Sequence, residues 1–378
     1  MKRLLLALIA MLAPVILLEL GLRLFGYNPF ADLLNGRELI LREARNSAQV
    51  YELTPGARGK AWGSQVSINS LGFRGREYTR AKPEGTFRIV VLGDSITFGN
   101  HLPLEATYAD QLEKLLIQDA PTNEVLNLGV GGYSTAQEAA LLAELGVSLE
   151  PDLVILGFCL NDLGVVSTNR TYIKRARTYG QSALYRARVA QWVQVQLDNI
   201  AATRHEREFL EVAPGSDPLD PETTQLQSRL AEGLAGLEDP PQFLDWYASP
   251  ARIAHLRVEL ERIRALAQEN DFPILAVIFP YLEDDPLYQF AYRILEYEFA
   301  RVGIATINVY EDFRVEGFER LQRGKNGDSV HPNREGHEIV TRRIKAYLEA
   351  KGMDPTLRPT TTSSAAATPT GLELGMEP

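Results

Sequence analysis

Short, largely apolar runs recur along the middle of the chain and alternate with longer amphipathic stretches. Runs of this length are typical of strands that are buried on both faces of a parallel sheet. They lie at residues 89–92, 124–129, 151–157, 273–279 and 306–310. Apolar residues at helical spacing lie between and after them, at about 108–116, 135–149, 249–270, 287–301 and 337–351. The alternation predicts an α/β domain in which helices cover a central parallel sheet.

The first residues follow a different pattern, a basic start and then an uninterrupted apolar run. Lys2 and Arg3 precede fifteen apolar residues, and the stretch reaches Phe25 if Glu19 and Arg23 are tolerated. As a helix this stretch would be about 33 Å long, which is enough to cross a bilayer. A cleaved signal peptide is the alternative, but neither a small-x-small cleavage site nor a lipobox cysteine follows. We therefore expect an uncleaved, single-pass helix in the cell membrane, with the catalytic or binding domain outside the cytoplasm.

Changes in composition divide the chain into segments. After the anchor or signal at 1–26, residues 27–86 are a turn-rich N-terminal extension, and 87–352 hold the α/β domain. A helical insertion at 165–250 interrupts that domain, either as a lid or as a solvated decoration. The insertion begins with a patch of six Lys or Arg residues. This patch is either a solvated face or a surface that attracts an anionic glycan or lipid head group. Residues 353–378, dominated by Thr, Pro, Ser and Ala, predict a disordered tail.

Charge and residue counts exclude several functions. A net charge of −10 leaves no basic surplus to neutralise phosphates, so we expect no nucleic-acid partner. The single cysteine, Cys159, excludes an intrachain disulfide and a cysteine-based zinc site. The five histidines lack His-Glu-x-x-His or similar ligand spacing, and the glycines at 129–132 do not form a dinucleotide fingerprint. We therefore expect neither a metal nor a cofactor.

The first buried run ends in a turn that carries candidate chemistry. Gly93 permits a tight turn, and Asp94 and Ser95 favour a helix start over a helix interior. Ser95 would therefore lie at the carboxyl end of a strand, where open α/β sheets bind ligands. Asn161 follows the third run in the same way, and its amide could cap the next segment or donate to an oxyanion. Capped turns without catalysis are the alternative interpretation of both positions.

A second element, Asp328-Ser-Val-His331-Pro332, lies in a loop before the last helix. A carboxylate three residues before a histidine can accept from imidazole Nδ1–H, which leaves Nε2 to take a proton from serine. When this motif stands alone, a capping Asp beside a surface His is the favoured explanation. Paired with Ser95 it becomes specific, because serine at pH 7 is a poor nucleophile without such a base. Pro332 is expected to start the helix.

Taken together, four blocks resemble those of the SGNH (GDSL) hydrolase superfamily, in its membrane-anchored bacterial type. They are Gly93-Asp94-Ser95-Ile96, Gly132, Asn161, and Asp328-x-x-His331-Pro332-Asn333, in that order within residues 87–348. The resemblance implies a flavodoxin-like three-layer sandwich. It makes Ser95 the nucleophile, His331 the base and Asp328 its orienting partner. It also implies an oxyanion hole made by the backbone N–H groups of Ser95 and Gly132 and the side chain of Asn161.

One position departs from the family pattern, because Leu160 stands where the family usually has a glycine directly before the asparagine. A larger side chain there is expected to narrow the pocket or shift Asn161.

The resemblance implies acyl transfer through Ser95. We expect a serine esterase or deacetylase that removes O-acyl or O-acetyl groups from an extracytoplasmic carbohydrate or lipid. An O-acyltransferase that modifies a cell-envelope glycan would use the same residues, since the acceptor is chosen by water exclusion and pocket shape. A membrane-tethered scaffold without catalysis is the third hypothesis. The sequence leaves the acyl group, the alcohol and the oligomeric state open.

Overall fold

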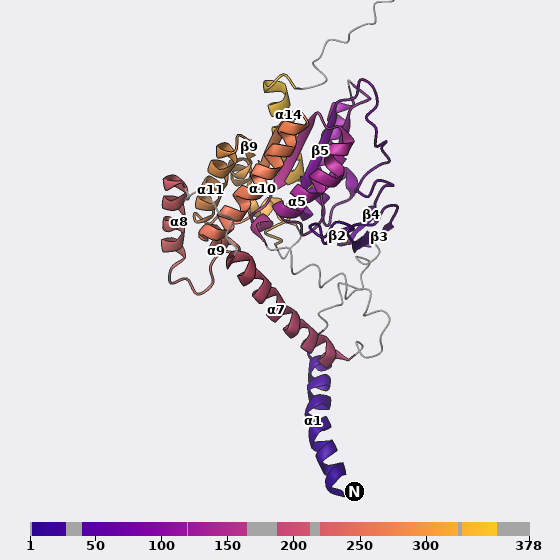
Figure 1. Ribbon diagram of the computed structural model, residues 1–378, viewed down its shortest axis with the longest axis vertical. Helices are drawn as coiled ribbons and strands as arrows, with labels where there is room; N and C mark the ends of the chain where they lie inside the picture. Colours follow the sequence, from indigo (N-terminus) through magenta and orange to yellow (C-terminus); the bar gives the residue numbers. More distant parts are fainter. Residues whose placement is uncertain are drawn as a thin grey trace, which may run out of the picture.

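A five-stranded parallel sheet forms the centre of the protein in a computed structural model that describes residues 2–27, 40–118, 120–164, 187–211, 220–323 and 327–353 (Figure 1). Its strands are β5 (Arg88–Gly93), β6 (Glu124–Asn127), β7 (Leu153–Phe158), β8 (Ile274–Ile278) and β9 (Ala305–Asn308). They lie in the order β6-β5-β7-β8-β9. Every residue of β5, β7 and β8 is buried, which explains why these strands appear in the sequence as continuous apolar runs.

Helices cover both faces of this sheet. Helices α4 (Tyr108–Leu116) and α14 (Arg334–Ala350) contact each other on one face. Right-handed crossovers place α5 (Thr135–Leu141), α10 (Pro250–Glu269) and α11 (Tyr288–Arg301) on the other. The strand order, 2-1-3-4-5 in chain terms, is that of flavodoxin-like sheets and confirms the predicted architecture. Strands are added on one side of β5 as far as β6 and on its other side from β7 onward, so the strand order reverses between β5 and β7 and a ligand crevice is expected at their carboxyl ends.

Some helix boundaries differ from the prediction. Helix α14 begins at Arg334, because the Asn333 side chain caps it by accepting from the N–H groups of Glu335 and Gly336. Pro332 therefore precedes the helix rather than starting it. The helix expected at 135–149 ends earlier as regular α-helix and continues as a π-turn and a 3₁₀ turn. The remaining short elements are α3 (Ser95–Phe98), η2 (Leu104–Ala106), η3 (Leu142–Gly146), η4 (Val147–Leu149), η5 (Leu160–Leu163), α12 (Tyr310–Glu316) and α13 (Phe318–Leu321).

The N-terminal extension forms two small hairpins that pack beside the sheet. Strands β1 (Leu41–Glu43) and β2 (Tyr51–Leu53) pair antiparallel, as do β3 (Arg58–Ala61) and β4 (Ser64–Ser67). The Tyr51 hydroxyl donates to the Gly131 carbonyl at 2.9 Å, and the Tyr133 hydroxyl donates to the Tyr51 carbonyl. The extension is therefore attached to the loop that follows β6.

The predicted helical insertion contains helices α7 (Arg188–Glu211), α8 (Pro221–Leu234) and α9 (Leu244–Tyr247). Helix α8 lies on α11, where the Thr223 hydroxyl donates to Glu298 and Glu298 forms a buried ion pair with Arg257. Nearly all of the predicted basic patch falls outside the described residues, as does the tail after 353. Whether the insertion is a lid or a solvated decoration stays a prediction. The division of the chain into domains stays a prediction.

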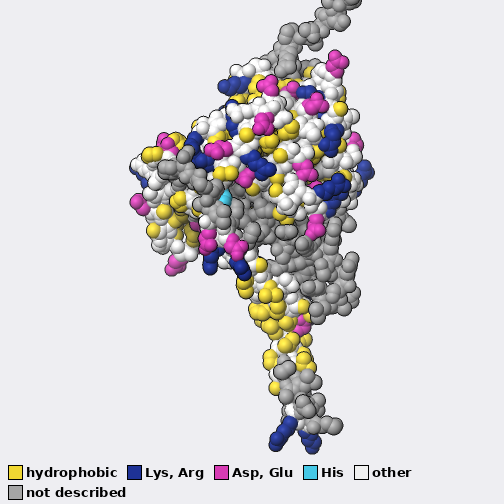
Figure 2. Space-filling model, viewed as in Figure 1, with side chains coloured by type: hydrophobic (Ala, Val, Ile, Leu, Met, Phe, Trp, Pro, Cys, Tyr) yellow, Lys and Arg dark blue, Asp and Glu magenta, His cyan; other side chains and the backbone are white. Residues whose placement is uncertain are grey.

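Helix α1 (Lys2–Leu24) projects from the α/β body and meets the end of α7 (Figure 1). The Val189 N–H donates to the Glu19 carboxylate at 2.8 Å in this junction. Hydrophobic side chains gather on α1 and the adjoining part of α7, whereas charges of both signs cover the body (Figure 2). Within the described residues, however, no helix is long and apolar enough to cross a membrane. The predicted membrane-spanning helix is therefore not supported.

Candidate active site

The turn between β5 and α3 presents Ser95 at the carboxyl edge of the sheet. Gly93 has φ +152°, and a Cβ at this position would lie 2.1 Å from Thr97 Oγ1, so only glycine fits. The Asp94 side chain caps α3 by accepting from the Ile96 N–H at 2.9 Å. Ser95 is the first residue of α3 and retains 8 % exposure. The local sequence thus fixes the serine hydroxyl at the crevice that the topology predicts.

The structure brings together three of the residues singled out in the sequence. Ser95 Oγ lies 2.9 Å from His331 Nε2, and His331 Nδ1 lies 2.9 Å from Asp328 Oδ2. The other Asp328 oxygen accepts from the backbone N–H groups of Val330 and His331, both at 3.0 Å. An ionised Asp328 accepts a hydrogen bond from Nδ1–H of His331 and so keeps the proton on that nitrogen. The Nε2 lone pair then faces the serine hydroxyl. This is the geometry in which a serine can be activated as a nucleophile.

Electrostatics favour an ionised carboxylate at Asp328. Burial alone would raise its pKa, but the hydrogen bond and charge of His331, together with the two backbone donors, hold the pKa of Asp328 well below its usual range. The group therefore stays negatively charged throughout the neutral range and can stabilise a histidine that has taken up a proton.

The expected oxyanion donors lie on the loops that follow β6 and β7. Gly132, after β6, is exposed and has φ +81°. Asn161, in η5, donates its amide to Asp94 Oδ2 at 3.0 Å, and the Ser95 hydroxyl lies 3.2 Å from the same oxygen. The amide nitrogen carries two hydrogens, and this bond engages one of them. Asp94 thus ties Asn161 to the serine turn.

Leu160, the residue that departs from the family pattern, has a fully buried side chain. Its backbone carbonyl accepts from the Tyr247 hydroxyl at 3.2 Å. The leucine side chain lies in the core, and the predicted narrowing of the pocket or shift of Asn161 stays a prediction.

The loop that carries Gly132 is held closely against α3. A Cβ on Gly129 would lie 2.4 Å from the Phe98 nitrogen, so glycine is required for this approach. The Asn127 side chain accepts from the Gly129 N–H at 3.0 Å and donates to the Thr97 carbonyl at 2.8 Å. These contacts fix the distance between the glycine loop and the serine turn.

Sequence reasoning missed Arg74, which lies in a segment where no chemistry was expected. Its side chain is buried, and its guanidinium donates to the carbonyls of Phe98, Gly99 and Leu102 at 2.7–2.8 Å. Burial lowers the pKa of Arg74 to about 10, so the group remains charged at neutral pH. Arg74 therefore binds the carboxyl end of the short helix whose first residue is Ser95.

Sequence reasoning also missed His101, whose ring lies edge-on to that of His331 with centroids 5.7 Å apart. Its backbone is left-handed, with φ +67°. Burial, followed by the charge of Arg323, lowers the pKa of His101. A nitrogen of each imidazole and an oxygen of Asp328 lie within 4.8 Å of one another, a group that could hold a metal ion. The spacing of histidines along the chain gave no sign of it, because the partners are 230 residues apart.

Two buried carboxyl groups lie behind the serine turn, on Glu138 and Asp162. Burial, reinforced by the charge of Asp94, raises the pKa of Glu138 well above its ordinary value. Burial and the charge of Glu138 do the same for Asp162. Burial therefore favours the neutral forms of Glu138 and Asp162.

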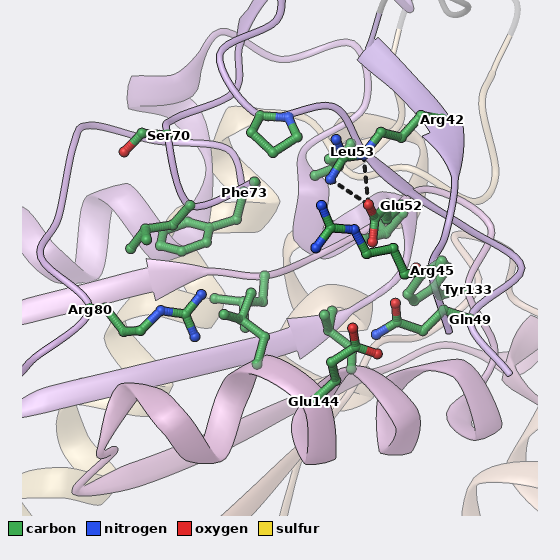
Figure 3. Close-up of a pocket in the computed structure, with 17 residues that line it drawn as sticks. Arg42, Arg45, Gln49, Glu52, Leu53, Ser70, Phe73, Arg80, Tyr133 and Glu144 are labelled. Atoms are coloured by element: carbon green, nitrogen blue, oxygen red, sulfur yellow. Dashed lines mark hydrogen bonds and ion pairs between the residues drawn. The ribbon is translucent and has the colours of Figure 1, made fainter. Parts of the chain in front are cut away.

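A cavity of about 280 Å³ lies away from the serine, between the β1–β2 hairpin, the 70–73 loop and α5 (Figure 3). Apolar side chains that include Phe73 and Leu128 form its lining together with Arg45, Arg80 and Glu144. None of the sequence-predicted site residues lines it. This cavity is therefore separate from the serine site.

The comparison with protein families identifies the class. Residues 91–339 match the GDSL-like Lipase/Acylhydrolase family, and this span contains Ser95, Gly132, Asn161, Asp328 and His331. The chain belongs to this family, which confirms the GDSL resemblance found in the sequence, whereas the membrane-anchored type stays a prediction.

Individual relatives are distant. An arylesterase from Vibrio mimicus is 29% identical over 82 residues, which cover 22% of this chain and 41% of that protein. The crystal structure of TesA is 15% identical with a TM-score of 0.40 and covers 70% of this chain and 98% of TesA. Axe2, an acetylxylan esterase from Geobacillus stearothermophilus, is 17% identical with a TM-score of 0.38, over 69% and 93% of the two chains.

Proposed function

We propose that the protein hydrolyses carboxylic esters through an acyl-enzyme on Ser95. The observation that carries this proposal is the relay of two 2.9 Å contacts that joins Ser95, His331 and Asp328. Ser95 Oγ attacks the ester carbonyl while His331 Nε2 takes the hydroxyl proton, and Asp328 stabilises the resulting imidazolium. His331 then returns the proton to the leaving alcohol. Water, activated by the same base, releases the acid and restores the serine.

The tetrahedral intermediate would be stabilised by three donors, the backbone N–H groups of Ser95 and Gly132 and the Asn161 amide. Each lies at the carboxyl edge of β5, β6 or β7, so all three can face one oxyanion. Removal of one such donor typically raises the barrier by about 2.7–4 kcal/mol. The bond from Asn161 to Asp94 keeps the amide oriented before substrate arrives.

We place the substrates among O-acylated or O-acetylated carbohydrates and lipids, and two side chains favour an alcohol that carries further hydroxyl groups. Asn100 is 8 % exposed and its Oδ1 is buried without a hydrogen-bond partner. Trp62, at the tip of the β3–β4 hairpin, and Asn100 both lie 3.6 Å from the position of a Cβ on Gly131, next to Gly132. If the surrounding side chains moved to open this atom, a sugar hydroxyl would satisfy the Asn100 acceptor, whereas an alkyl chain would leave it unpaired.

The same acyl-enzyme would serve an O-acyltransferase if a glycan hydroxyl replaced water, and the chemistry of Ser95 does not distinguish the two outcomes. The test is to assay the full chain with a series of 4-nitrophenyl esters and with an acetylated oligosaccharide. We expect turnover that is lost in Ser95→Ala and kept in Ser148→Ala, an exposed serine outside the site. Turnover that persists in Ser95→Ala would overturn the proposal. Acetyl transfer to an added glycan would assign the protein to the transferases.

We also propose that the domain acts outside the cytoplasm. This rests on Lys2 and Arg3, which precede the apolar stretch at the N-terminus. A reporter enzyme that is active only after export, fused after residue 353, tests it in a bacterial host. Reporter activity that depends on residues 1–26 is expected, and activity confined to the cytoplasm would contradict the proposal.

A further inference from the structure

A potential metal site overlaps the serine relay. Among the described residues, three metal-binding side chains come together at one place, where a ring nitrogen of His101, a ring nitrogen of His331 and an oxygen of Asp328 lie within 4.8 Å of one another. Two imidazoles and a carboxylate are a common ligand set for zinc. All three residues are partly exposed, so an ion can reach them from solvent.

The distances are close to those of a zinc centre. Ligands about 2.0–2.2 Å from a tetrahedral zinc ion lie roughly 3.3 Å from one another. The Nδ1 of His331 and the Oδ2 of Asp328 are 2.9 Å apart, and one ligand atom from each of the three residues lies within 4.8 Å of the others, so side-chain movements would bring them to this spacing. Three protein ligands leave the fourth position of the ion to water.

His101 is held in place by contacts outside this group. One ring nitrogen bonds to the backbone of Trp62, and its Nδ1 edge faces the hairpin tip, 3.8 Å from the position of a Cβ on Gly63. A backbone hydrogen bond of this kind is how proteins commonly orient a metal-binding histidine. The backbone of His101 is left-handed, and its ring lies edge-on to that of His331. The positive charge of Arg323 nearby opposes a cation, whereas Asp328 favours it.

A metal ion at this position would stop the relay whichever nitrogen of His331 it bound. On Nε2, the ion would occupy the lone pair that accepts the Ser95 proton. On Nδ1, it would displace the proton that His331 shares with Asp328. That proton would then reside on Nε2, and an imidazole protonated there cannot accept from serine.

We propose that His101, Asp328 and His331 bind Zn²⁺ and that the bound ion reversibly inhibits the enzyme. His101 supplies the ligand that the serine relay itself does not use. Metal binding is independent of the proposed function, and only the inhibition rests on it.

The test measures binding and activity separately with the full chain, stripped of metal by a chelator. Calorimetric titration with zinc chloride at pH 7 should show saturable binding of one equivalent, and magnesium, which prefers oxygen ligands, should not bind. His101→Asn, chosen because asparagine tolerates a left-handed backbone, should bind zinc at least about tenfold more weakly. His255→Gln, on α10 and outside the group, should bind like the unmodified chain. Zinc should inhibit the hydrolysis of 4-nitrophenyl acetate, and the chelator should reverse the inhibition. The rate with zinc is expressed as a fraction of the metal-free rate of the same variant.

Equal zinc affinity in His101→Asn and the unmodified chain would overturn the site, as would the absence of saturable binding. If His101→Asn does not fold, Asp328→Asn takes its place and must weaken binding as well. If zinc binds saturably and depends on His101 but does not inhibit hydrolysis, the proposal that the bound ion stops the serine relay would be refuted. A chain that binds zinc but hydrolyses no ester would instead contradict the proposed function and leave the metal site intact.

Discussion

Arg74 should determine both the stability of the protein and the position of its serine. The side chain is buried and makes three charge-assisted bonds to carbonyls, two at the end of α3 and one at Leu102 in the turn that follows. Bonds of this type contribute about 1.5–3 kcal/mol each, but water and backbone relaxation recover part of the loss. We therefore expect Arg74→Met to lower the free energy of unfolding by about 3–5 kcal/mol.

The lost contacts should also reduce activity, because α3 is a single turn that starts at Ser95. A displacement of about 1 Å in a reacting group can cost roughly a hundredfold in rate. The assay is urea unfolding of the full chain together with ester hydrolysis at a temperature where the variant is folded. Arg74→Lys should lose less stability than Arg74→Met, since an ammonium group keeps part of the hydrogen bonding. Arg58→Met, an exposed position in the same extension, should change stability by less than about 1 kcal/mol. An Arg74→Met protein with unchanged stability and rate would refute this reasoning.

Three further predictions concern titratable groups. Asp328→Asn should lower kcat by roughly 10³–10⁴, because the asparagine no longer fixes the Nδ1–H tautomer of His331, and steady-state kinetics with a 4-nitrophenyl ester would detect it. Burial lowers the pKa of His337 to about 3, so the histidine is neutral in the folded protein but protonated in the unfolded chain below about pH 6.5. Its contribution to stability is therefore lost as pH falls from 6.5 toward 3, at about 1.4 kcal/mol per pH unit, and urea unfolding of His337→Gln should show a flatter acid limb. The contribution of Glu138 to stability depends on pH in the opposite direction. Its raised pKa favours the protonated form in the folded protein, whereas in the unfolded chain the group ionises above about pH 4.5. The free energy of unfolding therefore falls as pH rises. Glu138→Gln should flatten that alkaline limb, and an unchanged slope would show that Glu138 ionises freely in the folded state.

The sheet could be predicted because its strands are buried on both faces. Positions 89–92 and 153–158 are apolar without interruption, and such runs are recognisable without knowledge of the tertiary structure. Helix ends were less predictable, because they depend on single side-chain contacts such as the Asn333 cap. The N-terminal run gave a helix of nearly the expected extent, but its suitability for crossing a membrane was not supported.

The positions that the four blocks singled out converge at one edge of the sheet, although their catalytic roles stay a prediction. Ser95, Asp328 and His331 could be found because each occupies a characteristic local context, a turn or a loop before a helix. Arg74 could not, since an arginine between two glycines gives no sign that it will be buried against α3. His101 was missed for a related reason, as its contact with His331 exists only after the chain has folded.

The most direct test of the central claim is to trap the acyl-enzyme. Full-length protein would be mixed with 4-nitrophenyl acetate, quenched in acid within the first turnovers and analysed by peptide mass spectrometry. The account predicts one added acetyl group on the peptide that contains Ser95, and no modification of that peptide in Ser95→Ala. Acetylation of a different residue, or ester hydrolysis that continues in Ser95→Ala, would contradict it.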